Sequence, residues 1–206
     1  MGKALLKNKG LIFIVSAPSG AGKTTLCMKI IRKMNNLVQS VSFTTRQPRP
    51  GEIHDKDYSF ITRKEFRMMV DEGDFVEWAE VHGNLYGTSR RRLNDILASG
   101  FDVLLDIDTQ GAKQIRNLFK NGVFIFILPP TMKELRNRLE KRMSNTHDDI
   151  DRRLKRAVNE IRDYKIYDYV IVNDVIKNAM GKIEAIIIAE RIKNSNADLT
   201  GSGKFY

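Results

Sequence analysis

A glycine-rich turn near the amino terminus constrains the fold of this chain more than any other feature. It reads Ala17-Pro18-Ser19-Gly20-Ala21-Gly22-Lys23-Thr24, and Thr25 follows it. The apolar run Leu11–Val15 before it is typical of a strand buried on both faces, and the pattern after it, to about Met34, is helical. The turn fits the phosphate-binding pattern G-x-x-x-x-G-K-[ST], with alanine in place of the first glycine. A strand, this turn and a helix in that order predict a nucleoside triphosphate site.

Each residue type in this turn suits phosphate binding. Glycines allow consecutive backbone N–H groups to wrap closely around a phosphate, the lysine reaches the terminal phosphates, and the Thr24 hydroxyl suits Mg²⁺. The helix that starts here adds its positive end at the same place. An ordinary glycine-rich turn is the alternative, and the strand and helix around the motif make it the weaker one.

The rest of the chain alternates strand-like and helix-like patterns. Apolar runs at 101–106, 123–128 and 169–172 predict further buried strands. Helical patterns occupy about 89–99, 112–119, 132–142, 148–164 and 175–193. This order predicts an α/β fold, in which a doubly wound parallel sheet with right-handed crossovers is flanked by helices.

The stretch from Val38 to Tyr86 has a different pattern. Half-polar strands are predicted at 38–43, 57–61 and 75–81. One helix is predicted at 63–72, which Thr62 and Glu65 open as a capping box. Short strands with a single helix predict a small α+β lobe inserted into the parallel core.

Composition restricts the class of protein and of partner. The 206 residues are 42% hydrophobic, which suits a globular core, and the single cysteine, Cys27, excludes a disulfide-stapled domain. No apolar run approaches the ~18 residues of a membrane span, so we expect a cytoplasmic protein. The net charge of +10 indicates an anionic partner: phosphorylated metabolites, an acidic membrane or nucleic acid.

Two pairs of charged residues are further candidates for a site. Arg46 and Arg49, three residues apart in a proline-stiffened loop, could present paired guanidinium groups to one phosphate, or belong to a polar loop without a role. Asp106 and Asp108 follow an apolar run, and the carboxyl edge of a parallel sheet is where ligands bind. For both aspartates, capping of the following helix is an open alternative.

Beyond these motifs, the sequence resembles the bacterial guanylate kinases. The resemblance covers about residues 10–190 and is carried, in the family's order, by 42–52, 75–80, 83–88, 106–111, 138–142 and 170–174. It implies a P-loop nucleoside monophosphate kinase fold that transfers the γ-phosphoryl group of ATP to GMP. The implied core comprises 10–37, 89–137 and 156–190, with an inserted GMP-binding lobe at 38–88 and a helical lid at 138–155. Residues 195–206 are expected to form a flexible tail.

The resemblance also assigns roles to single residues. ATP would be bound by Ala17, Pro18, Ser19, Gly20, Ala21, Gly22, Lys23, Thr24, Thr25 and Asn173. GMP would be bound by Ser42, Arg46, Arg49, Tyr58, Glu77, Tyr86, Gly87, Thr88 and Asp108, of which Arg46, Arg49, Tyr58 and Tyr86 would hold the phosphate and Ser42, Glu77 and Thr88 the guanine. Lys23 and the lid arginines Arg138, Arg142 and Arg153 would act in catalysis. Mg²⁺ would lie at Thr24, with Asp106 acting on it indirectly.

The chain departs from the family pattern before Tyr58. Asp55 stands where many members carry glycine, and aspartate tolerates the left-handed conformation that such a turn requires.

Three other functions remain open alternatives. A catalytically silent protein-binding module would characteristically have lost P-loop or lid residues, whereas Lys23, Thr24, Arg138 and Arg142 are all present. A nucleic-acid-binding role lacks stacking-aromatic or helix-turn-helix signals. A kinase for another nucleoside monophosphate is the nearer alternative. We therefore expect ATP and GMP as substrates, with dGMP as an alternative acceptor, and no nucleic-acid or membrane partner.

Overall fold

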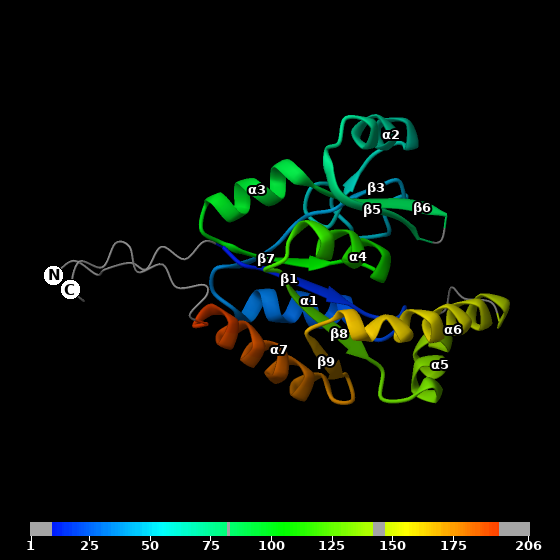
Figure 1. The fold of residues 1–206 in the computed structure, drawn as a ribbon. Coiled ribbons are helices and arrows are strands. Elements are labelled where there is room, and N and C mark those ends of the chain that lie inside the picture. Colours follow the sequence, from blue (N-terminus) through cyan, green and yellow to red (C-terminus); the bar gives the residue numbers. More distant parts are fainter. Residues whose placement is uncertain (1–9, 82, 142–146, 194–206) are drawn as a thin grey trace, which may run out of the picture.

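A parallel sheet of five strands forms the centre of the molecule (Figure 1). The computed structural model describes residues 10–81, 83–141 and 147–193. The strand order is β2-β7-β1-β8-β9, and every neighbouring pair is parallel. The strands are β1 (Ile12–Ser16), β2 (Leu37–Gln39), β7 (Asp102–Asp106), β8 (Val123–Leu128) and β9 (Tyr169–Val172).

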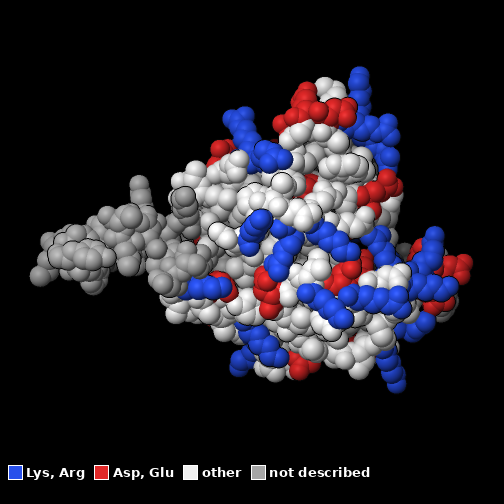
Figure 2. Space-filling model, viewed as in Figure 1, with Lys and Arg blue, Asp and Glu red and all other residues white. Residues whose placement is uncertain are grey.

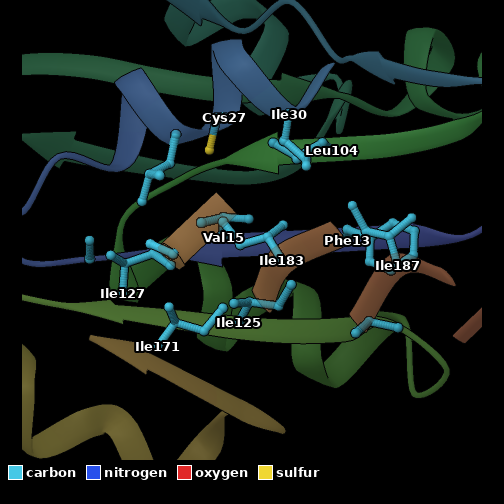
Figure 3. Close-up of a cluster of buried hydrophobic side chains, with 14 of the residues drawn as sticks. Phe13, Val15, Cys27, Ile30, Leu104, Ile125, Ile127, Ile171, Ile183 and Ile187 are labelled. Atoms are coloured by element: carbon cyan, nitrogen blue, oxygen red, sulfur yellow. The ribbon is translucent and has the colours of Figure 1, made fainter. Parts of the chain in front are cut away.

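Helices cover both faces of this sheet, because alternate residues of each strand point to opposite sides and both sets are apolar. Phe13 and Val15 of β1 face α1 (Lys23–Lys33) and α7 (Ile176–Arg191). Figure 3 shows Ile183 and Ile187 of α7 packed over these strands. Ile12 and Ile14 belong to the opposite core, under α3 (Arg90–Ala98) and α4 (Thr109–Leu118). The predicted doubly wound α/β core is confirmed.

A separate lobe lies between β2 and α3 in the chain and at the top of Figure 1. Its mixed sheet has the order β4-β3-β6-β5, formed by β3 (Phe43–Thr44), β4 (Ser59–Phe60), β5 (Phe75–Val81) and β6 (Asn84–Ser89). Its helix α2 (Arg63–Asp71) begins at the predicted capping box, in which Thr62 and Glu65 each bond the other's backbone N–H. Phe66, Phe75 and Leu85 form its own small core.

Two helices lie beside the glycine-rich turn. α5 (Met132–Glu140) packs on α6 (His147–Arg162), which continues into the short 3₁₀ helix η1 (Asp163–Ile166). A Cβ added at Gly20 would lie 2.9 Å from Leu139 of α5, so the turn and this helix are in direct contact. The predicted lid, 138–155, spans the end of α5 and the start of α6. Arg142 and the predicted tail at 195–206 lie outside the described residues.

Three details of the sequence-based prediction are wrong. The run Val38–Phe43 is not one strand of the lobe: β2 pairs with β7 in the central sheet, and the chain passes through the buried Ser40 before it forms β3. The helix expected at 112–119 begins at Thr109, because the Asp108 side chain caps it. Strand β6 was not predicted. Among the described residues, no helix is long and apolar enough to cross a membrane.

The lobe core yields a test of its stability. Phe66 is fully buried and stacks on Phe75 with ring centroids 4.5 Å apart. Phe66→Ala should lower the free energy of unfolding by about 3 kcal/mol, through lost burial and the cavity left behind. Met68→Ala on the same helix is the matched control, since Met68 is 51% exposed, and it should cost less than about 0.5 kcal/mol. Denaturant unfolding measures both values, and equal effects would contradict the packing described here.

Candidate active site

One pocket opens at the carboxyl ends of β1 and β7 and is shared by the core and the lobe. From the core it is lined by Lys23, Thr24, Asp106, Ile107 and Asp108, and from the lobe by Ser42, Tyr58, Glu77, Ala79, Val81 and Tyr86. Eight of these eleven residues were predicted as site residues. The fold thus brings a phosphate-binding loop and a polar lobe surface to one place, where parallel α/β sheets bind ligands.

The glycine-rich turn has the backbone that phosphate binding requires. Gly20 and Gly22 both have φ of +94°, a conformation that side chains rarely adopt. At Gly22 a Cβ would also lie 2.5 Å from Nδ2 of Asn173. That amide donates to the Ala21 carbonyl at 2.8 Å, and Arg138 donates to the same carbonyl at 3.3 Å and to the Asn173 carbonyl at 3.1 Å. Asn173 and Arg138 therefore hold the turn from behind, and both were predicted as site residues.

Lys23 projects from the turn into the pocket. Its Nζ lies 2.7 Å from Oδ1 of Asp106 and donates to the Ile107 carbonyl at 2.7 Å. Burial opposes the ammonium charge, but the Asp106 carboxylate outweighs it and raises the pKa of Lys23. The lysine is therefore charged at neutral pH and fixed to the end of β7.

Glu77 is the most deeply buried acid of the pocket, only 4% exposed. Its Oε1 accepts a 2.5 Å hydrogen bond from the Thr88 hydroxyl on the neighbouring strand. Its Oε2 packs against the first turn of α4, where a Cβ on Gly111 would lie 2.3 Å away. Glycine at 111 thus leaves the space that this carboxylate occupies.

Burial raises the pKa of Glu77 to about 7, although the hydrogen bond from Thr88 opposes the shift. In the part of the chain that the structure describes, Glu77 forms no salt bridge. A buried carboxylate of this kind suits a ligand that brings its own hydrogen-bond donors.

The lobe also places aromatic hydroxyls and an arginine at the pocket. Tyr58 and Tyr86 pack edge to face, with ring centroids 6.0 Å apart. The Arg46 guanidinium lies 5.4 Å from the Tyr58 ring centroid and pairs with Glu52 at 2.9 Å. Burial, reinforced by the Asp106 carboxylate, raises the pKa of Tyr58 to about 12, so its hydroxyl remains a donor at neutral pH.

Asp108 has two roles at once. Its Oδ1 accepts from the Gly111 N–H at 2.9 Å as the cap of α4, while the residue also lines the pocket. Its Oδ2 lies 3.5 Å from Arg156, which pairs with Glu160 at 2.9 Å. Arg156 was not among the predicted site residues. Its i,i+4 spacing from Glu160 was the available signal, and only the fold brings that pair to Asp108.

Several predicted site residues lie outside the pocket lining. The Arg49 side chain is exposed, as is Thr25, and Arg153 is half-buried on α6. Gly87 of β6 packs under the lobe, because a Cβ there would lie 2.9 Å from the Phe75 ring. Glycine at this position is therefore required by packing in the lobe core.

The oxygen donors of the pocket fit Mg²⁺. Thr24 supplies a hydroxyl and Asp106 a carboxylate, both at the pocket wall. Among the described residues no cluster of three or more His, Cys, Asp or Glu could hold a metal by itself. Mg²⁺ in nucleotide sites generally keeps several waters and is held by one or two protein oxygens together with substrate phosphates.

Basic side chains, with acidic ones among them, occupy much of the face of the molecule seen in Figure 2. Figure 2 shows Lys and Arg spread over one face of the molecule, including the part formed by α6. The net charge of +10 favours polyanionic ligands.

Comparison with known proteins shows the family to which the chain belongs. Residues 9–190 match the family model described as guanylate kinase. The guanylate kinase of Geobacter metallireducens is 54% identical over 188 residues, which cover 91% of this chain and 93% of that protein. That of Caldanaerobacter subterraneus is 46% identical, covering 94% and 95% respectively. The crystal structure of guanylate kinase from Anaplasma phagocytophilum superposes with a TM-score of 0.78 at 39% identity, covering 93% of this chain and 92% of that one. This chain belongs to the guanylate kinase family.

Proposed function

We propose that this protein transfers the γ-phosphoryl group of ATP to GMP, giving ADP and GDP. The observation that carries the proposal is the shared pocket, in which Lys23 of the phosphate-binding turn and the buried Glu77 face the same space. A triphosphate at the turn and a guanine at Glu77 would bring donor and acceptor phosphates together between them. Both substrates belong to the cytoplasm, and a single buried cysteine, Cys27, suits that reducing compartment.

In this proposal, Glu77 and Thr88 recognise the guanine by hydrogen bonds. Guanine carries N1–H and N2–H₂ donors side by side, and one carboxylate can accept from both. Ser42 and Asp108, which line the same pocket, complete the polar edge. Arg46, Tyr58 and Tyr86 bind the GMP phosphate, and Arg49 joins them by a change of side-chain conformation.

The transfer relies on positioning and on charge. A GMP phosphate oxygen, already anionic, forms a bond to the γ-phosphorus of ATP while the bond from that phosphorus to the β–γ bridging oxygen breaks, and ADP leaves. Lys23 neutralises charge on the terminal phosphates, and Arg138, Arg142 and Arg153 approach the transferring group from the lid. Residues 17–25 would hold the phosphates. Asn173, which is hydrogen-bonded to the Ala21 carbonyl of the turn, would lie near the adenine. Mg²⁺, when bound, would be held through Thr24, with Asp106 acting on it indirectly, and would shield the phosphate charges.

The Lys23 assignment gives the first kinetic prediction. Lys23→Ala should lower kcat by roughly a hundredfold or more, because charge that develops on the terminal phosphates loses its neutralising partner. Lys29→Ala, an exposed position on the same helix, is the matched control and should keep parental turnover. A coupled assay with ATP and GMP measures both variants, and circular dichroism checks their folding. Near-parental turnover in Lys23→Ala would refute the ATP-site assignment.

Base choice gives the second prediction. Adenine has no hydrogen at N1, so AMP would leave the buried Glu77 carboxylate without its bond, at a cost of about 3 kcal/mol or a hundredfold in kcat/KM. Glu77→Gln should raise the KM for GMP strongly and leave the KM for ATP nearly unchanged. Glu80→Gln, an exposed position on the same strand, is the control. The parent and both variants are assayed against GMP, dGMP, AMP, UMP and dTMP. Parental activity on AMP within tenfold of that on GMP would sink the assignment.

The raised pKa of Glu77 gives a pH prediction. The carboxylate is the form that accepts from guanine, and with a pKa of about 7 it declines from pH 8 to pH 6. The KM for GMP of the parent should therefore rise by about tenfold over that range. Glu77→Gln retains the titration of GMP itself, so the difference between the two profiles isolates Glu77. Identical profiles would show that Glu77 does not titrate in the free enzyme.

The same shift predicts the effect on stability. The pKa of Glu77 is about 7 in the folded protein and 4.5 in the unfolded chain. The contribution of its carboxyl group to the stability of the fold therefore becomes less favourable as pH rises from 4.5 to about 7. At pH 8 the melting temperature of Glu77→Gln should accordingly equal or exceed that of the parent. A clear decrease would mean that the carboxylate stabilises the fold.

A further inference from the structure

Arg92, which lies outside the pocket lining, connects the core to the lobe. It lies in the first turn of α3, directly after the last strand of the lobe. Its Nη1 donates to the Ser59 hydroxyl at 2.6 Å, and its Nη2 lies 3.1 Å from Oδ1 of Asp55. Its guanidinium carbon lies 4.4 Å from the centroid of the Phe43 ring. One side chain of the core thus contacts two separate segments of the lobe, the turn before β4 with its first residue Ser59, and β3.

Asp55 is held in an unusual conformation. Its φ of +59° lies in the left-handed region, which costs free energy in most residues and least in glycine, asparagine and aspartate. Besides Arg92, its Oδ1 accepts a 2.5 Å hydrogen bond from the Ser59 hydroxyl, and its Oδ2 lies 3.3 Å from Nε2 of His54. Arg92, Asp55 and Ser59 therefore form a closed ring of polar contacts, which we call the Arg92 latch.

The latch fixes the turn that carries Tyr58. The Asp55 backbone N–H donates to the Tyr58 carbonyl at 2.9 Å, and the Ile53 N–H donates to Asp57 at 2.8 Å, so residues 53–58 form one tight turn. Ser59, the next residue, is buried, and its N–H donates to the Ser42 carbonyl at 2.9 Å. Tyr58 and Ser42 both line the pocket, whereas Arg92, Asp55 and Ser59 do not.

We propose that the Arg92 latch positions Tyr58 and Ser42 for the acceptor nucleotide, and that Arg92 and Asp55 are positioning residues for GMP. The inference rests on the proposed function, since it concerns the GMP side of the pocket. It assigns the latch no contact with ATP. It also gives Asp55 a role that glycine at the same position could not fill, since glycine adopts the conformation but offers no carboxylate to Arg92.

The energetics separate this role from one in stability alone. Arg92 and Asp55 have side-chain exposures of 36% and 53%, and ion pairs this exposed contribute little to the free energy of unfolding. Their loss should consequently leave the fold intact while the turn, and Tyr58 with it, gains alternative positions. The expected consequence is weaker GMP binding at nearly unchanged turnover.

The test uses Arg92→Ala, Asp55→Gly and the double variant of the full chain. Each single variant should raise the KM for GMP five- to tenfold, with kcat and the KM for ATP within twofold of the parent. Because both variants break the Arg92–Asp55 pair, the loss in the double variant should be smaller than the sum of the two single losses. Asp55→Asn, which retains an acceptor and tolerates the left-handed conformation, should rescue most of the affinity. Arg91→Ala, the preceding and exposed arginine of the same helix, is the control and should match the parent.

Calorimetric titration of GMP in the absence of ATP separates the latch from the proposed function. A five- to tenfold higher Kd for GMP in Arg92→Ala and Asp55→Gly supports the latch without any reference to catalysis. Unchanged Kd and KM in both variants, additive losses in the double variant, or equal losses for GMP and ATP would each overturn it. Failure of the parent to phosphorylate GMP would instead contradict the proposed function, and the Kd comparison would still decide the latch.

Discussion

The ion pair between Lys23 and Asp106 fixes the position of the phosphate-binding turn, and the rest of the site depends on it. The lysine extends from the phosphate-binding turn after β1, and the aspartate ends β7, the neighbouring strand. A buried ammonium group without such a partner would be costly, so the position of the turn depends on the end of β7. The same strand end leads to Asp108, which caps α4, and the first turn of α4 lies against Glu77. Lys23 on one side of the pocket and Glu77 on the other are thereby both held in place from the end of β7.

A local irregularity in β5 lets this strand contact both the lobe and the central core. The register between β5 and β6 shifts between Phe75 and Glu77, as in a β-bulge. Phe75 then packs in the lobe core, while Val76 packs in the central core. The side-chain amide of Gln114 on α4 binds both backbone groups of Trp78: it accepts from the N–H at 3.2 Å and donates to the carbonyl at 2.7 Å. Glu77 lies between Val76, which packs in the central core, and Trp78, which is bound to Gln114. These two contacts keep the buried acid in a defined position relative to α4.

The sequence predicted the parts of the molecule that local patterns determine. The phosphate-binding turn, the apolar strands and the capping box at Thr62 each follow from a few consecutive residues, and all are present. Resemblance added the acceptor residues, and most of those line the pocket. Local patterns failed where tertiary contacts decide. The segment 38–43 has one continuous strand-like pattern, yet its two halves belong to different sheets. Arg92 and Arg156 have the pattern of solvated helix residues, and only the folded chain brings them to Asp55 and Asp108.

In the proposed function, the protonation states in the pocket explain how it would select a base and still transfer a phosphoryl group without a strong general base. The acceptor oxygen of GMP is anionic before it reacts, so the rate depends on cations and alignment rather than on proton removal. Lys23, whose pKa is raised by Asp106, stays charged, and Tyr58, whose pKa is about 12, stays a hydrogen-bond donor. Both suit phosphates. Burial raises the pKa of Glu77 to about 7, and in the proposed function this residue faces the guanine, a neutral base with two neighbouring N–H donors. In the proposed function, Glu77, which can change its charge near pH 7, therefore selects the nucleotide, while Lys23 and Tyr58, which keep their charge and proton, act on the phosphates.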